Sequence, residues 1–243
     1  MSSSARVLIV THTDVEGPGR IKDALDDMFV NQEQVRLLDE KHPILPSADE
    51  LLGVVIMGGP MGACDWSDHP GLKAEAKLSR LCVRENIPLI GVCLGHQIIA
   101  TALGAKLHDA STKEIGWGKI RQVGSSATIR WPGNIGDETS VLHWHGDTVD
   151  VPQHAQLLAS SKKTENQAFT IGSALGLQFH AEVNYQELNT WLADKQMTKD
   201  ISAKDCERIR DKYKKNNAEA VALANELFQG FAARVVSRSK QLQ

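Results

Sequence analysis

The sequence is short of cysteine, of basic charge and of long apolar runs, and each shortage excludes a class of protein. Its 243 residues hold four cysteines and no C-x-x-C pair, so neither a disulfide framework nor a cysteine-based zinc site is expected. Asp and Glu outnumber Lys and Arg by 30 to 27, which excludes a general electrostatic grip on nucleic acid. The longest apolar runs are short, such as Val7–Val10 and Val54–Met57, whereas a membrane span needs roughly 20 residues.

The length of the chain predicts its domain organisation, and its first residues bear on its cellular compartment. A chain of 243 residues, against a prior of about 150 per domain, predicts one large domain, or one domain with an extension. We place a catalytic domain at residues 1–196 and a helical extension packed on it at residues 197–243. Met1–Arg6 lacks the apolar core of a signal peptide, which together with the few cysteines favours a cytoplasmic protein. The oligomeric state stays open.

The first half of the chain alternates short buried strands with helical spacing. Strands are predicted at Arg6–Val10, Gly53–Met57 and Pro88–Val92. Helices are predicted at Gly17–Met28, Leu72–Glu85 and Gly95–Leu103, the last with Gly104 as its C-cap. This order predicts a three-layer α/β fold, with a mostly parallel central sheet flanked by helices.

Beyond Ala105 the pattern changes to strands that follow one another. They are predicted at Lys106–Leu107, Gly118–Val123, Ala127–Arg130, Thr139–Trp144, Leu157–Ser160, Ala168–Ile171 and Leu175–Phe179. Such a series suits an antiparallel extension of the sheet. After Tyr185 the chain is helical, with a helix at Ala218–Val235 that Asn217 would cap. We favour a helix packed on the sheet over one that binds a partner.

A cysteine stands between a predicted strand and a predicted helix. Cys93 has Gly91 two residues before it and Gly95 two residues after it. This is the form of a nucleophile elbow, a strained turn whose small neighbours let strand and helix pass closely. At a helix N-terminus the macrodipole favours the thiolate. The alternative is a structural cysteine beside a glycine turn, but the complete strand–elbow–helix unit favours a nucleophile.

A cysteine nucleophile needs a base, and nine histidines compete for that role. His180 is the best placed because it ends the apolar run Leu175–Phe179, at the edge where open parallel sheets form their sites. Glu182 points the same way as His180 if the backbone stays extended, so its carboxylate can orient the imidazole. His-x-Glu alone is a common coincidence. The glycine turn Gly58–Pro60 follows a strand at the same edge and can present a backbone N–H to a ligand.

Together these motifs resemble the class I glutamine amidotransferases, the triad type with a cysteine nucleophile. The matching segments, in the family's order, are Gly58–Pro60, Gly91–Gln97 and Gln178–Glu182, and the resemblance spans Arg6 to Tyr185. Within the family, the closest likeness is to the glutaminase domain of GMP synthase and its stand-alone relatives. It rests on Gly58–Met61, Glu114–Trp117 and His145–Asp147. The resemblance implies a flavodoxin-like fold.

The resemblance also assigns roles to residues. Cys93 would attack the side-chain amide of glutamine, and His180 would move the proton from the thiol to the departing ammonia. Glu182 would fix the imidazole, and the backbone N–H groups of Gly59 and Leu94 would form the oxyanion hole. The residues expected to bind substrate are Gln97, Trp144, Gly146 and Asp147.

No cofactor and no metal are expected. His143 and His145 share a face of a strand, but no third ligand stands at a suggestive spacing. Glu114–Trp117 is better explained as a structural or pocket-lining strand than as a catalytic element. His96, one residue before Gln97, is expected to be a packing residue.

Three functions follow from the resemblance and the residues. The first is a glutaminase that supplies ammonia to a separate synthase, because the helical residues after Tyr185 hold no Gly-rich phosphate loop for an ATP-using domain. The second is a free-standing hydrolase of other γ-glutamyl peptides or amides with the same triad. The third is a non-enzymatic module that binds a partner, and the intact Cys93, His180 and Glu182 argue against it. Neither nucleic acid nor membrane is an expected partner.

Overall fold

The protein is built on a nine-stranded sheet in a computed structural model that describes residues 5–124 and 138–242. The strand order is β2-β1-β3-β4-β9-β8-β7-β5-β6. The strands are β1 (Arg6–Val10), β2 (Gln32–Val35), β3 (Leu51–Ile56), β4 (Leu89–Val92), β5 (Leu107–Gln122), β6 (Thr139–Val149), β7 (Gln156–Ser160), β8 (Ala168–Ile171) and β9 (Ala174–Leu177). The helices are α1 (Gly19–Asp27), η1 (Ala48–Glu50), α2 (Gly71–Arg84), α3 (Leu94–Ala102), α4 (Tyr185–Ala193) and α5 (Ala203–Gln241). The strand expected at Ala127–Arg130 lies outside the described residues.

The sheet has a parallel half and an antiparallel half. Strands β2, β1, β3, β4 and β9 pair in parallel, and the pairs from β9 through β8, β7 and β5 to β6 are antiparallel. In the parallel half Val10 pairs with Ile56, and Ile56 pairs with Gly91. The carboxyl ends of β1, β3 and β4 therefore lie at one edge, as the alternation of strands and helices predicts.

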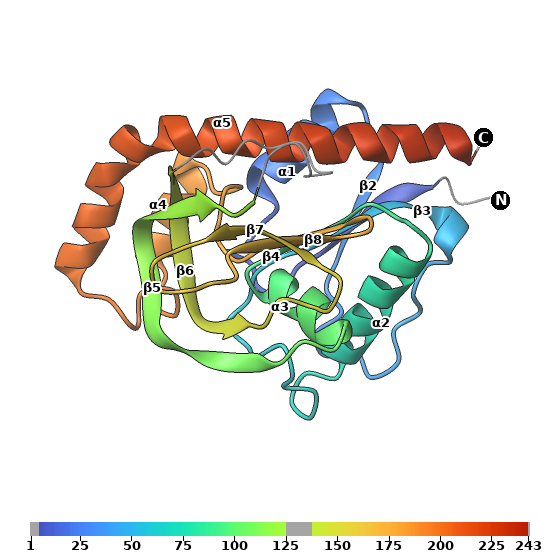
Figure 1. The fold of residues 1–243 in the computed structure, drawn as a ribbon, viewed down its shortest axis with the longest axis horizontal. Coiled ribbons are helices and arrows are strands. Elements are labelled where there is room, and N and C mark those ends of the chain that lie inside the picture. The colour runs from blue at the N-terminus through green and yellow to red at the C-terminus, as the bar shows by residue number, and fades with distance from the viewer. Residues whose placement is uncertain (1–4, 125–137, 243) are drawn as a thin grey trace.

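Helices cover both faces of the parallel half (Figure 1). Helices α1 and α5 lie over one face, and α2 and α3 lie over the other. Strands β5 and β6 extend beyond these layers as a long antiparallel pair. The result is the predicted three-layer α/β arrangement with an antiparallel extension.

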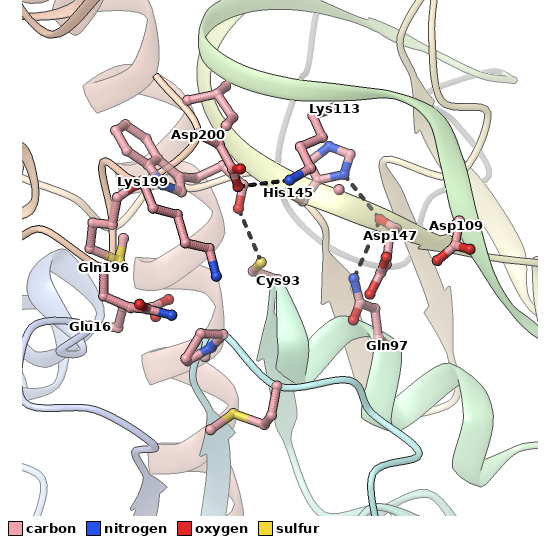
Figure 2. A pocket seen from close by; sticks show the side chains of 17 residues that line it. Glu16, Cys93, Gln97, Asp109, Lys113, His145, Asp147, Gln196, Lys199 and Asp200 are labelled. Carbon is pink, nitrogen blue, oxygen red and sulfur yellow. Dashed lines mark hydrogen bonds and ion pairs between the residues drawn. The ribbon is translucent and has the colours of Figure 1, made fainter. Parts of the chain in front are cut away.

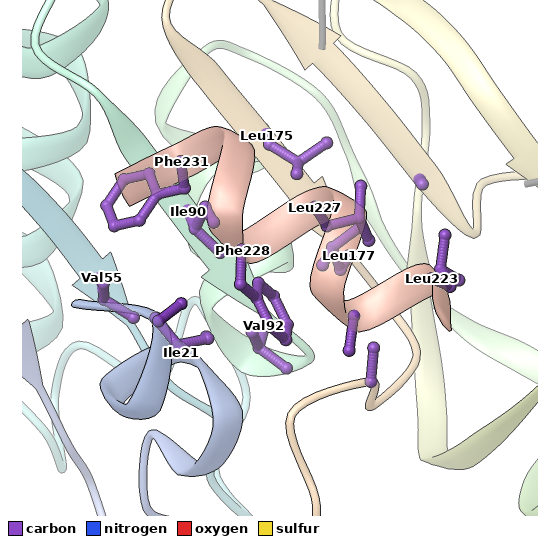
Figure 3. Packing of buried hydrophobic residues seen from close by; sticks show 14 of the residues in the cluster. Ile21, Val55, Ile90, Val92, Leu175, Leu177, Leu223, Leu227, Phe228 and Phe231 are labelled. Atoms are coloured by element: carbon purple, nitrogen blue, oxygen red, sulfur yellow. The ribbon is translucent and has the colours of Figure 1, made fainter. Parts of the chain in front are cut away.

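The long helix α5 shares the main apolar core with the sheet (Figure 3). Phe228 and Phe231 of α5 lie in one cluster with Ile90 of β4, Leu175 of β9 and Ile21 of α1. A fully buried apolar side chain of this size contributes about 1.5–3 kcal/mol to stability. Helix α5 is thus held by the same core as the parallel strands, and the division of the chain at residue 197 stays a prediction.

Three elements differ from the sequence-based expectation. Strand β2 was missed because Gln32–Val35 is a polar edge strand without apolar alternation. The two short strands expected at Lys106–Leu107 and Gly118–Val123 form the single strand β5. Helix α5 begins at Ala203 and not at Ala218, because Ser202 and Asp205 form a capping box. Asn217 is therefore inside the helix, and the prediction that it is an N-cap is wrong.

The two ends of the described chain lie together. Ala5 and Leu242 line the same hollow, which lies at the carboxyl end of α5 in Figure 1. This end holds the amino ends of the parallel strands. Among residues 5–124 and 138–242, none of the helices combines the length and apolar character required to cross a membrane.

Candidate active site

One pocket forms where the loops after β1, β3 and β4 meet. Because these three strands are parallel neighbours, their following loops lie side by side, and they contribute Glu16, Gly59 and Cys93 to the pocket lining. The cavity has a volume of about 400 Å³. That is within the range of small-molecule sites, roughly 300–1,000 Å³.

The backbone at Cys93 has the strain of a nucleophile elbow. Its φ of 51° and ψ of −102° lie where residues with a side chain are rare. The flanking glycines permit the turn: a Cβ on Gly95 would overlap the carbonyl oxygen of Ile56, and one on Gly91 would overlap Gly95. Strand β4 and helix α3 can therefore approach each other closely, as the motif predicts. Cys93 is largely buried and lines the pocket, and its thiol donates a 3.7 Å hydrogen bond to the carbonyl of Trp144.

His180 and Glu182 form a buried pair behind the cysteine. Nδ1 of His180 donates a hydrogen bond to Oε1 of Glu182 at 2.7 Å, and both side chains are about 1% exposed. The backbone of His180 is fixed by a bridge to Leu142 of β6. The ring also meets Trp191 edge-on at 4.8 Å between centroids. Backbone and packing together leave the imidazole a single orientation.

The electrostatics of His180 connect it to the thiol. Burial lowers its pKa, but the charge and the hydrogen bond of Glu182, together with the nearby Cys93, outweigh this and leave the pKa well above its usual value. Nδ1 is taken by Glu182, so the interaction with Cys93 falls to Nε2. Among residues 5–124 and 138–242, Nε2 has no nitrogen or oxygen partner. Glu182, His180 and Cys93 can therefore act as one chain for a proton.

Two backbone N–H groups are candidates for the oxyanion hole. Leu94 is the first residue of α3, where N–H groups have no partner within the helix, and Gly59 lines the pocket. Neither donates a hydrogen bond within the described part of the chain. The two residues are close, because a Cβ on Gly59 would lie 2.9 Å from Cδ2 of Leu94. The geometry is compatible with an oxyanion hole and leaves its assignment a prediction.

The residues expected to bind substrate all line this pocket (Figure 2): Gln97, Trp144, Gly146 and Asp147. Nε2 of Gln97 donates to Oε1 of Gln178 at 3.2 Å and to the carbonyl of Asp147 at 3.4 Å, which ties α3 to β6. Burial raises the pKa of Asp147, and repulsion from Asp109 adds to the rise. This side of the pocket is therefore polar and ordered.

Several residues that line the pocket were not predicted from the sequence, because the strand order brings them together. Glu16 lies in the loop after β1, and Lys113 of β5 forms a 2.7 Å ion pair with Asp200 across the rim. Gln196 and Lys199 line the pocket from the segment after α4. For Glu16 a signal was available, because an acidic residue shortly after a buried parallel strand falls at the edge that carries the nucleophile.

The structure supplies the third ligand-type residue that the sequence left out. Glu114, His143 and His145 are buried, and one ligand atom of each lies within 4.8 Å of the others. Nε2 of His145 is 3.4 Å from Glu114, whose carboxylate also accepts hydrogen bonds from Ser161 and Gln167. Burial opposes ionisation of Glu114, but this pairing lowers its pKa to about 2. These contacts are those of a buried polar cluster in which Ser161 and Gln167 hold the carboxylate of Glu114, and the absence of a metal stays a prediction.

His96 is placed outside the site. Its ring is fully buried and packs at 4.9 Å on the ring of Phe169, and burial lowers its pKa to about 3. It does not line the pocket, although the adjacent Gln97 does. Cys64 is exposed and also absent from the lining.

Comparison with known proteins identifies the family. The sequence matches the family model described as glutamine amidotransferase class-I over residues 20–199. The chain belongs to the class I glutamine amidotransferases. The resemblance inferred from the motifs around Gly59, Cys93 and His180 is thereby confirmed.

The amidotransferase has relatives of similar length. It is 32% identical over 187 residues to the glutamine amidotransferase-like protein YfeJ of Salmonella typhimurium, covering 73% of this chain and 75% of that protein. It is 30% identical over 167 residues to one subunit of the glutamine-hydrolyzing GMP synthase of Sulfolobus acidocaldarius, covering 67% and 82% of the two chains. The crystal structure of a glutamine amidotransferase from Thermotoga maritima matches with a TM-score of 0.75 at 30% identity, covering 97% of each chain. The fold is therefore that of the family.

Proposed function

We propose that this amidotransferase hydrolyses the side-chain amide of glutamine to glutamate and ammonia through a thioester on Cys93. The observation that carries the proposal is the buried pair of His180 and Glu182, 2.7 Å apart, whose imidazole interacts with the Cys93 thiol at the pocket. A nucleophile, a base and a group that orients the base are the parts that acyl transfer requires.

In the first half-reaction Cys93 attacks the amide carbon. Nε2 of His180 takes the thiol proton as the S–C bond forms, and then gives it to the amide nitrogen as the C–N bond breaks. Glu182 accepts the hydrogen bond from Nδ1 throughout, so it holds the tautomer and stabilises the imidazolium. Ammonia leaves and the γ-glutamyl thioester remains.

The second half-reaction releases glutamate. Water loses a proton to His180 and attacks the thioester, and the sulfur departs with that proton returned to it. In both halves the carbonyl oxygen gains negative charge, which the N–H groups of Gly59 and Leu94 would stabilise. Removal of one such donor costs on the order of 100-fold or more in rate.

The polar side of the pocket suits the glutamyl part of the substrate. Gln97, Trp144, Gly146 and Asp147 line the pocket beside Cys93, and Gln97 is already held by two hydrogen bonds. We assign these residues to substrate binding. Their order in the absence of ligand reduces the entropy that binding must cost.

The likeness to one GMP synthase subunit supports delivery of the ammonia to a separate synthase. A second candidate, hydrolysis of other γ-glutamyl peptides or amides, is favoured by the continuation of the pocket past Cys93 to Glu16 and Gln196. The two differ only in the leaving group. Release of ammonia from glutamine, compared with release of amines from several γ-glutamyl donors, separates them.

The function is tested by removing the thiol. Cys93→Ala and Cys93→Ser should abolish ammonia release, whereas Cys64→Ala, which removes an exposed thiol outside the pocket, should not. Mass spectrometry of wild-type protein quenched during turnover should show the γ-glutamyl adduct on the peptide that contains Cys93. Full turnover by Cys93→Ala would refute the assignment.

A further inference from the structure

Glu16 places an unpartnered carboxylate in the wall of the catalytic pocket. The residue is 5% exposed and lines the cavity, as Figure 2 shows. Within residues 5–124 and 138–242 its side chain makes neither a hydrogen bond nor an ion pair; only its backbone N–H is bonded, to Thr13. A carboxylate that lines a pocket and has no partner in the protein is available to form a charge-assisted contact with a cationic ligand.

The charges around Glu16 leave it uncompensated. Two buried histidines lie near it, and each already has its own carboxylate: His12 is 2.9 Å from Glu75, and His180 is 2.7 Å from Glu182. Burial raises the pKa of Glu16, and the charges of His180 and His12 oppose the rise. Glu16 is therefore the third carboxylate in a group with two histidines, each of which already has a carboxylate partner.

The position of Glu16 relative to His180 indicates which part of the substrate lies beside Glu16. A Cβ on Gly58 would overlap Oε2 of Glu16 and lie 3.4 Å from Cε1 of His180. The side chains of Glu16 and His180 therefore both pack against Gly58. In Figure 2 Glu16 and Gln196 lie on one side of Cys93, and Gln97 and Asp147 lie on the other. With the glutamyl part beside Gln97, the group that departs after protonation by His180 lies beside Glu16.

We propose that Glu16 forms a leaving-group subsite for cationic amines, so that the substrates include γ-glutamyl amides whose amine carries a second, positively charged group. This rests on the proposed hydrolysis through Cys93. In the step, the Cys93 sulfur bonds to the amide carbon, the C–N bond breaks, and the thiol proton passes through His180 to the departing nitrogen. The products are the thioester and a free amine whose distal ammonium pairs with the Glu16 carboxylate.

One positive side chain stands at the same end of the pocket. Lys199 lines the cavity but is exposed, whereas Glu16 is buried. Water screens a charge at the rim far more than one in the wall, so the buried carboxylate determines which charge is accepted. Asp200 is neutralised by its ion pair with Lys113. Among the described residues, the buried Glu16 carboxylate therefore has no ion-pair partner at the leaving-group end.

Two synthetic substrates of the same size test the proposal. The N-(2-aminoethyl) and N-propyl amides of the glutamate side chain differ only in a terminal ammonium against a methyl group. Wild-type enzyme should hydrolyse the aminoethyl amide with a kcat/KM about tenfold or more higher, the scale of one charge-assisted contact. Glu16→Gln should reduce the ratio to about twofold or less, and Glu16→Asp should retain part of it. The matched control, Asp109→Asn on the opposite side of Cys93, should keep the wild-type ratio.

Several outcomes overturn the subsite, and they are distinct from failure of the proposed function. The subsite is refuted if wild-type enzyme hydrolyses both amides equally, if it hydrolyses glutamine and neither amide, or if Glu16→Gln keeps the ratio. All three leave turnover dependent on Cys93. Failure of the function itself is seen instead as turnover of every substrate by Cys93→Ala. Thermal unfolding of each variant shows that the ratios refer to folded protein.

Discussion

Nδ1 of His12 donates a 2.9 Å hydrogen bond to the carbonyl oxygen of Gly58. A carbonyl can only accept, so Nδ1 carries the proton, and Nε2 on the other side of the ring is 2.9 Å from Glu75. Burial lowers the pKa of His12, but the hydrogen bond and charge of Glu75 outweigh it and leave the pKa raised. Because a trans peptide is planar, fixing the Gly58 carbonyl also fixes the opposite direction for the N–H of Gly59.

His12 is therefore expected to position the oxyanion hole. His12→Ala should lower kcat by about tenfold to 100-fold with little change in KM, because the Gly59 N–H acts on charge that develops after binding. His12→Asn, whose amide can reach the Gly58 carbonyl from the Nδ1 position, should recover part of the loss. Steady-state kinetics with glutamine measures both. A rise in KM with unchanged kcat would contradict the positioning role.

The strained backbone at Cys93 predicts an opposition between stability and activity. Relief of a positive φ is worth about 1–3 kcal/mol, and glycine relieves it whereas alanine does not. Cys93→Gly should therefore resist urea better than Cys93→Ala by about 1 kcal/mol, although neither turns over substrate. The matched control is Cys82 inside α2, where the glycine variant should be the less stable of the pair. The same order at both positions would show that Cys93 is not strained.

Replacement of the two buried histidines His180 and His96 should have different effects on turnover and stability. His180→Ala removes the base paired with Glu182 and should lower kcat on the order of 100-fold or more. His96→Ala removes a neutral ring packed on Phe169, so it should lower the unfolding temperature and keep turnover within about tenfold of wild type where it is folded. Measurements of ammonia release and thermal unfolding for both variants distinguish a loss of turnover from a loss of stability. An equal loss of kcat would place His96 in the catalytic machinery.

Glu187 should make stability depend on pH. Burial raises its pKa to about 7 from a usual 4.5, against the opposing hydrogen bond from the backbone of Asn184. The folded protein therefore binds the proton more tightly, and the free energy of unfolding falls as pH rises from about 4.5 to about 7. Glu187→Gln keeps the capping box and lacks this fall. Urea unfolding should show the variant gaining on wild type between about pH 5 and pH 8, and a constant difference would contradict the raised pKa.

Local motifs made the centre of the site predictable from sequence. Gly91, Cys93 and Gly95 define their turn through contacts within a few residues, so the elbow could be placed before any fold was known. His180 and Glu182 were found by the same logic, because a strand that ends at the active edge presents alternate residues to one side.

Features that depend on pairing between distant segments were not predictable. Strand β2 has a polar sequence and forms only because β1 offers a free edge. Glu114 meets His143 and His145 through the register of β5 with β6, which the spacing of the histidines alone does not reveal. The buried strand before Glu16 places that residue at the active edge, but its presence in one pocket with Gly59 and Cys93 depends on β1 lying next to β3.

Ala5 and Leu242 share a hollow at the amino ends of the parallel strands, while the pocket that Cys93 lines opens at their carboxyl ends. A linker attached at either end of the described chain would therefore leave the opposite edge of the sheet exposed. On a sensor chip, the protein immobilised through such a linker would keep its pocket accessible to the solution. The binding of substrate analogues can then be measured without the chip surface blocking the pocket.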